Sequence, residues 1–301
     1  MLPLNILHAH SPRQVATQTA ALAWPPISSL PVLVQTPQVE VVSGLPNVSN
    51  AQASALVTRL MRAYRYDLRR QGWSAPLYPV YPFTAAVLSK QRIFQQWPGA
   101  AAYTPGPGLI AIGPQHLIEG DSDGVLAHEL SHMLHGGTAP TQLKLPRPIE
   151  EGNAKKVQHD YLQSLGLADP ALPRAAAFLA TVTPEYARYV LEQCWANLQG
   201  ASQVGKEEDT GELFHEFLRT RLLPNEGRAG ADPVLLFGKI VRDLPANLTV
   251  AHAGYRTQFN DEFRAQFGVS FQEAENQFLA YLAKTQGDAT QRLAGTIWDG
   301  P

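Results

Sequence analysis

One segment of the chain, residues 121–137, indicates the fold class. It reads Asp-Ser-Asp-Gly-Val-Leu-Ala-His-Glu-Leu-Ser-His-Met-Leu-His-Gly-Gly. Its first three residues can cap the N-terminus of a helix, and Gly136-Gly137 can end one. The apolar residues between these two ends are typical of a helix that packs inside the protein. The segment therefore predicts a buried helix whose start and stop are both defined locally.

His128, Glu129 and His132 form a His-Glu-x-x-His motif within this helix. Because residues four apart lie on one helix face, both imidazoles can reach a single zinc ion. Glu129 points off that line, beside the metal, where its carboxylate can take a proton from zinc-bound water. The motif therefore predicts a zinc site with Glu129 as the general base.

A third metal ligand is expected downstream of the motif. Glu151 is separated from His132 by 18 residues and stands near the start of a second predicted helix, about residues 149–165. Glu150 is the competing candidate, but on a helix it faces another direction. We therefore predict that His128, His132 and Glu151 bind the metal.

At this point the sequence resembles the gluzincins, the thermolysin-like clan of zinc metallopeptidases. Their second helix commonly reads Glu-Gly-x-Ala with the ligand before the glycine, as residues 151–154 do here. The resemblance covers about residues 100–165 and implies a Zn2+ cofactor, a peptide or protein substrate and a zincin-like fold. It also implies that an edge strand ahead of the active-site helix, here residues 109–112, binds extended substrate backbone.

The chain departs from related patterns at several positions. Metzincins have glycine and histidine where this chain has His135 and Thr138, and the Gly-x-Met-Glu-Asn signature of large zinc aminopeptidases is absent. Thermolysin places an aspartate four residues after its glutamate ligand to orient a histidine, whereas Lys155 stands there in this chain. The orienting partner must come from elsewhere, and Asn153 and Asp160 are the candidates.

Peptide hydrolysis also needs a donor that faces the developing negative charge. The gluzincin clan uses a tyrosine or histidine of its helical lobe, and His215 lies 64 residues past Glu151. His215 is therefore named beside Glu129 as a catalytic residue, with an ordinary helix histidine as the alternative interpretation. The weaker candidates are Tyr186, Tyr189, His252 and Tyr255.

The rest of the chain divides into three expected parts. Residues 1–37 contain few charges and several prolines, which indicates an extended N-terminal arm. Residues 38–168 predict an α/β catalytic lobe with a small mixed sheet, and residues 169–301 predict an all-helical lobe, so the fold class is α+β. Expected strands are residues 39–42, 77–81 and a hairpin of 100–104 with 109–112; expected helices are 50–71, 86–97, 149–165, 171–182, 185–199, 207–223, 232–243 and 256–285.

Composition excludes several classes of partner. The 301 residues include 24 basic and 26 acidic side chains, so the formal net charge is −2 and nucleic acid has little support as a partner. No apolar run is long enough for a membrane-spanning helix. The N-terminus lacks the cationic start and apolar stretch of a signal peptide, so we expect a soluble cytoplasmic protein. The oligomeric state is open.

Together these features predict a zinc metallopeptidase that hydrolyses peptide bonds through a zinc-activated water. The alternative is a zinc-binding regulatory or pseudo-peptidase protein that keeps the fold without efficient turnover. The replacement of the orienting aspartate by Lys155 motivates that alternative.

Overall fold

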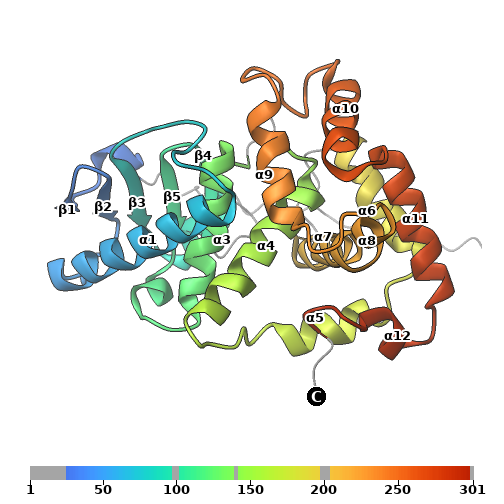
Figure 1. Cartoon of the computed structure of the whole chain (residues 1–301). Helices are drawn as coiled ribbons and strands as arrows, with labels where there is room; N and C mark the ends of the chain where they lie inside the picture. The colour runs from blue at the N-terminus through green and yellow to red at the C-terminus, as the bar shows by residue number, and fades with distance from the viewer. Residues whose placement is uncertain (1–24, 97–101, 139–141, 197–203, 299–301) are drawn as a thin grey trace, which may run out of the picture.

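The structure, a computed structural model, describes residues 25–96, 102–138, 142–196 and 204–298. A five-stranded mixed sheet lies at one end of the molecule and the C-terminal helices lie at the other, with helices α3 and α4 between them (Figure 1). This arrangement confirms the expected α+β class. Within the described ranges, no helix has both the length and the apolar character needed to cross a bilayer.

The sheet has the strand order β1-β2-β3-β5-β4. Strand β2 pairs in parallel with β3, and β3 pairs in parallel with β5, while the two outer pairs are antiparallel. The central strands are apolar and buried because both faces of the sheet are covered. The strands are β1 (Val32–Gln35), β2 (Val39–Ser43), β3 (Phe83–Val87), β4 (Ala102–Gly106) and β5 (Leu109–Ile112).

Helices cover each face of the sheet. Helix α1 (Asn50–Arg70) packs against β1 and β2, and α3 (Ser122–His135) packs against β4, β5 and α1 (Figure 1). A capping box of Ser49 and Gln52 starts α1, and its apolar face enters the main core. A smaller core on the other face includes Ile93 of helix α2 (Lys90–Gln96).

The chain is helical after the sheet. Helix α4 (Arg147–Ser164) passes through the middle of the molecule and contacts α3 on one side and α7 on the other. A π-helical turn, η4 (Leu218–Leu222), continues α7 into α8. The remaining helices are α5 (Leu172–Leu179), α6 (Pro184–Ala196), α7 (Val204–Phe217), α8 (Leu223–Asn225), α9 (Pro233–Asp243), α10 (Tyr255–Phe267), α11 (Phe271–Lys284) and α12 (Ala289–Leu293).

Helices α4 and α7 cross at a pair of glycines. A Cβ atom at Gly152 would overlap the backbone of Gly211, and one at Gly211 would overlap the carbonyl oxygen of Pro148. The glycine of the Glu-Gly-x-Ala pattern therefore has a packing reason, since only a residue without a side chain allows this approach. The crossing brings the α7 side chains close to the helix that bears Glu151.

Most expected elements are confirmed, including the β4–β5 hairpin and the helix break at Gly268. The prediction of a strand at residues 77–81 is wrong. Prolines at positions 76, 79 and 82 remove backbone donors there, and the strand forms instead at the proline-free segment Phe83–Val87. This strand takes up Ala86 and Val87, so the following helix α2 starts later than expected.

The expected N-terminal arm is described only from residue 25 onward. Its last part forms a short 3-10 turn, Ile27–Ser29, and then β1, an edge strand of the sheet. Residues 1–24 lie outside the described part of the chain.

Candidate metal centre

Helix α3 is fixed at both ends. Asp121 precedes the helix but makes no capping bond, and Asp123 instead forms an ion pair of 2.5 Å with Arg59 of α1. At the other end Gly136 adopts a φ of 109°, and the amide of Gly137 donates to the carbonyl of His132 at 2.7 Å. The expected glycine stop is confirmed. These anchors hold the His-Glu-x-x-His segment rigidly between α1 and β4.

The structure brings His128, His132 and Glu151 together. The Nε2 atoms of the two histidines are 3.1 Å apart. The Oε2 atom of Glu151 lies 3.4 Å from Nε2 of His128 and 3.2 Å from Nε2 of His132. All three side chains are buried, with exposed fractions of 7%, 2% and 5%. They form a group of donor atoms that can hold a metal ion.

The geometry of this group fits zinc. A tetrahedral zinc ion with ligands at 2.0–2.1 Å has donor atoms about 3.3–3.4 Å apart. Of the three distances between the donor atoms, 3.4 Å equals that edge length and 3.1 and 3.2 Å are slightly shorter. Two imidazoles with one carboxylate are a usual ligand set for catalytic zinc. Three protein ligands leave a fourth position for water or substrate. The group is hereafter called the triad.

Glu150, the competing ligand candidate, has a different place. Its Oε1 atom accepts from Nδ1 of His132 at 3.0 Å, and its Oε2 atom accepts from Nδ1 of His135 at 2.8 Å. Burial alone would raise the pKa of Glu150, but His135 and His132 outweigh it and lower that pKa to about 2. Because the carboxylate of Glu150 accepts from Nδ1 of His132, a metal ion at the triad would be bound by the Nε2 atom of His132.

The prediction that Asn153 or Asp160 orients a metal-binding histidine is wrong. Asp160 pairs with Lys156 and Arg70, and the side-chain amide of Asn153 has no hydrogen-bond partner among the described residues. Glu150 does the orienting for His132. For His128 the structure provides no equivalent, because its Nδ1 atom also lacks a partner within the described ranges.

Glu208 of α7 lies near the triad. The run of charged residues 206–209 by itself suggests a helix start exposed to solvent. The carboxylate of Glu208 is 3.8 Å from Nζ of Lys155, and its side chain is only 19% exposed. Burial raises the pKa of Glu208, and the charges of His128 and Glu151 also act on it. No spacing in the sequence relates α7 to the motif helix, so this proximity could not be foreseen.

Glu129 lies beside the triad in a closed environment. Its carboxylate accepts from the hydroxyl of Thr104 at 2.8 Å. Burial raises the pKa of Glu129 to about 7, and the charge of His132 and the hydrogen bond from Thr104 limit that rise. A carboxyl group with this pKa can both accept and give up a proton near neutral pH.

The edge strand next to α3 is not the one expected from the sequence. Residues 109–112 were expected to form an edge strand, but β5 pairs with β3 on one side and with β4 on the other. The edge strand is β4, which contains Thr104 and Pro105. An edge position tolerates proline because one side of the strand needs no donors, while the apolar sequence of β5 requires an interior position.

His215 occupies a buried position on α7. Its Nε2 atom donates to the carbonyl oxygen of Ile149 at 3.3 Å, and its ring packs on Phe237 with centroids 4.7 Å apart. Burial lowers the pKa of His215 to about 3, so the ring is neutral. None of its described contacts joins it to the triad, and its role as an oxyanion donor stays a prediction.

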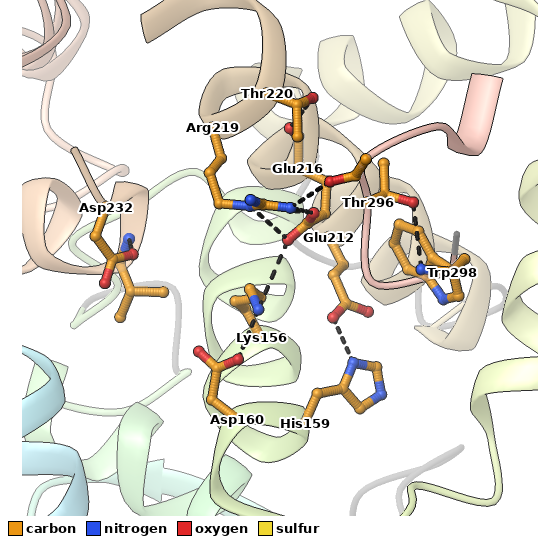
Figure 2. Close-up of polar contacts among 12 residues, drawn as sticks. Lys156, His159, Asp160, Glu212, Glu216, Arg219, Thr220, Asp232, Thr296 and Trp298 are labelled. Atoms are coloured by element: carbon orange, nitrogen blue, oxygen red, sulfur yellow. Dashed lines mark hydrogen bonds and ion pairs between the residues drawn. The ribbon is translucent and has the colours of Figure 1, made fainter. Parts of the chain in front are cut away.

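Buried charged side chains link α4 to α7 (Figure 2). Nζ of Lys156 lies 2.6 Å from Asp160 and 3.6 Å from Glu216. Nδ1 of His159 lies 2.5 Å from Glu212 and its Nε2 lies 2.9 Å from Asp169. This network fixes the rotation of α4 about its own axis, and with it the direction of Glu151.

No protein-family model matches the chain, and no curated protein sequence is significantly similar to it. Among solved structures, the chain matches a mutant of an M1 zinc metallopeptidase from Deinococcus radiodurans, with a TM-score of 0.44 and 16% sequence identity. The match covers 84% of this chain and 50% of the other, so the chain spans half the length of that peptidase.

Proposed function

We propose that the protein is a zinc-dependent peptidase in which His128, His132 and Glu151 bind the metal. The observation that supports this most is the spacing of the three donor atoms, 3.1, 3.2 and 3.4 Å, against about 3.3–3.4 Å for tetrahedral zinc. A surface cluster of acidic groups would not place two imidazole nitrogens and a buried carboxylate at these distances.

The residues around the triad suit the hydrolysis of an amide bond. Zinc held there would polarise a peptide carbonyl group and lower the pKa of a water molecule towards 7. The carboxylate of Glu129 would accept a proton from the attacking water and then give it to the leaving amine. Glu150 meanwhile keeps His132 in the correct tautomer.

The test combines metal content with cleavage of a peptide library. We expect about one zinc per chain in the purified protein, and its loss in Glu151→Gln. Glu129→Gln should keep the zinc and lower the rate of hydrolysis by about 10²- to 10⁴-fold, because only the proton transfer is removed. Full activity of Glu129→Gln would rule out this mechanism, and a wild-type protein that never binds zinc would rule out the site.

A second candidate is a zinc-binding protein without efficient turnover. It is favoured by the Nδ1 atom of His128, which lacks the orienting partner that a catalytic site normally provides within the described residues. It is also favoured by His215, whose hydrogen bond goes to Ile149. Stoichiometric zinc without cleavage of any library peptide or unfolded protein would support this second candidate over the first.

A further inference from the structure

Thr104 faces the catalytic helix from the edge strand β4. Its hydroxyl oxygen lies 2.8 Å from Oε2 of Glu129 and 3.0 Å from the backbone carbonyl oxygen of the same residue. The side chain is fully buried, with an exposed fraction of 0%. One hydroxyl therefore spans the main chain and the carboxylate of a single glutamate, which leaves that side chain little freedom to rotate.

The backbone of Thr104 is itself held in place. Its carbonyl oxygen accepts from the amide of Thr138 at 3.0 Å and from the hydroxyl of Thr138 at 2.9 Å. Close by, a Cβ atom at Gly137 would overlap the backbone of Gly106, so β4 and the residues after α3 touch without intervening side chains. Gly137 and Thr138 directly follow the end of α3, where His132 and His135 lie. The hydroxyl is thus fixed relative to the triad.

A hydroxyl group has one proton to donate and two lone pairs with which to accept. The single hydroxyl proton of Thr104 can go to the carboxylate oxygen or to the backbone carbonyl oxygen of Glu129, and the hydroxyl lies within hydrogen-bond distance of both.

We propose that Thr104 is a positioning residue that holds the carboxylate of Glu129 in its working orientation. The proposal rests on the proposed function, since Glu129 matters as a general base only if the protein is a peptidase. Precise orientation of a catalytic group contributes strongly to rate, and displacement by about 1 Å can cost about a hundredfold. Thr104 acts through Glu129 and touches none of the three triad residues in the contacts described.

The experiment compares Thr104→Val, Thr104→Ala and Thr104→Ser with Thr138→Val. The valine variant removes the hydroxyl at nearly constant volume, the alanine variant removes it without crowding the carboxylate, and the serine variant restores it. Thr138→Val is the matched control because it removes a buried hydroxyl at the same strand contact but keeps the hydrogen bond from the amide of residue 138 to the carbonyl oxygen of Thr104, and Thr138 does not touch Glu129. Zinc content, kcat, KM and the crystal structure of each zinc-loaded variant are measured.

We expect Thr104→Val and Thr104→Ala to lower kcat by about ten- to a hundredfold while KM stays within about threefold. Their zinc content should equal that of the wild type, and Glu129 should leave its original rotamer in their crystal structures. Thr104→Ser and Thr138→Val should keep both kcat and the rotamer. A Thr104→Ala variant with an unmoved Glu129, or a Thr138→Val variant that is equally impaired, would overturn the proposal.

The crystal structures also separate this proposal from the proposed function. If the wild type binds zinc but cleaves nothing, the peptidase assignment fails, and the rotamer of Glu129 in the Thr104 variants still decides whether Thr104 holds it. If the wild type is active and the variants keep both kcat and the rotamer, the peptidase assignment stands and the role of Thr104 is refuted.

Discussion

Two neighbouring glutamates of α4 have different roles in the metal site. Glu151 completes the triad, whereas Glu150 accepts from Nδ1 of both His132 and His135. Successive residues on a helix point about 100° apart, so only one of two adjacent carboxylates can face the metal. The other faces α3, where it fixes a ligand from behind. His135 is the second partner of Glu150.

Replacement of Glu150 by glutamine should weaken metal binding without removing a ligand. We expect zinc affinity to fall by about 10- to 100-fold, because the amide is a poorer acceptor for Nδ1 of His132. Competition with a chromophoric chelator measures this change. His135→Gln serves as the control, since it touches Glu150 but no ligand, and should have the smaller effect. An unchanged zinc affinity in Glu150→Gln would contradict the orienting role.

Helix α4 connects the metal ligands to the helical part of the molecule. One face carries Glu150 and Glu151 toward α3, and the opposite side carries Lys156 and His159 toward α7 (Figure 2). The glycines at the α4–α7 crossing allow this double contact. Buried ion pairs between two helices are costly to break because an unpaired charge then remains in the interior.

Alanine at the helix crossing should destabilise the fold. In Gly211→Ala the new methyl group meets the backbone of Pro148, which cannot move aside as a flexible side chain would. We expect a loss of about 1–3 kcal/mol or more in the free energy of unfolding, measured in urea. Gly254→Ala is the control, because the nearest atom to its added Cβ is 3.6 Å away. Equal stability of the two variants would show that the crossing is less tight than described.

His159 should make stability depend on pH. Burial lowers the pKa of His159, but Glu212 and Asp169 outweigh it and raise that pKa to about 9. Because the folded value lies above the unfolded value of about 6.5, the stabilisation is complete below pH 6.5 and is lost as the pH rises through 9. The wild type should therefore lose up to about 3 kcal/mol of unfolding free energy across that window.

The measurement is a series of urea unfolding curves between pH 6 and pH 10 for the wild type and His159→Gln. The variant should be less stable at pH 6 and should show a much flatter pH dependence. His252→Gln provides a control on the exposed surface. A variant curve that runs parallel to the wild-type curve over the whole range would contradict the assignment.

The two ends of the molecule depend on each other through the metal site. The triad draws ligands from α3, which packs on the sheet, and from α4, which packs on α7. The donor atoms therefore reach their spacing only when both parts are folded. A ligand that binds only the native state stabilises it by mass action.

Removal of zinc should accordingly lower the stability of the entire chain. With free zinc at about 100 times its Kd, the expected contribution is about 2.7 kcal/mol, and chelation should lower Tm by several degrees. Differential scanning calorimetry with and without EDTA measures the shift. In Glu151→Gln the chelator should have little effect. An equal EDTA effect in that variant would place the metal at another site.

Short-range spacing accounts for the features that were predictable from the residues. The placement of His128 and His132 on one face follows from helix geometry, and the stop at Gly136 follows from its freedom to adopt a positive φ. The preference for Glu151 over Glu150 came from the resemblance of residues 151–154 to the Glu-Gly-x-Ala pattern, together with the different directions of adjacent helix positions. These are relations between residues within a few turns of each other, which local chemistry governs.

The contacts between distant segments were not predictable in this way. Which strand lies at the sheet edge, which residue orients His132 and which hydroxyl holds Glu129 all depend on how β4, α3 and α4 pack together. Glu208 lies near the triad for the same reason, because the glycine crossing brings α7 close to α4, where Glu208 pairs with Lys155. Periodicity in the sequence indicates which face of a helix is buried, but not which residues pack against that face. The metal ligands could therefore be predicted from the spacing of the motif, whereas the residues that orient them are decided by the packing of distant segments.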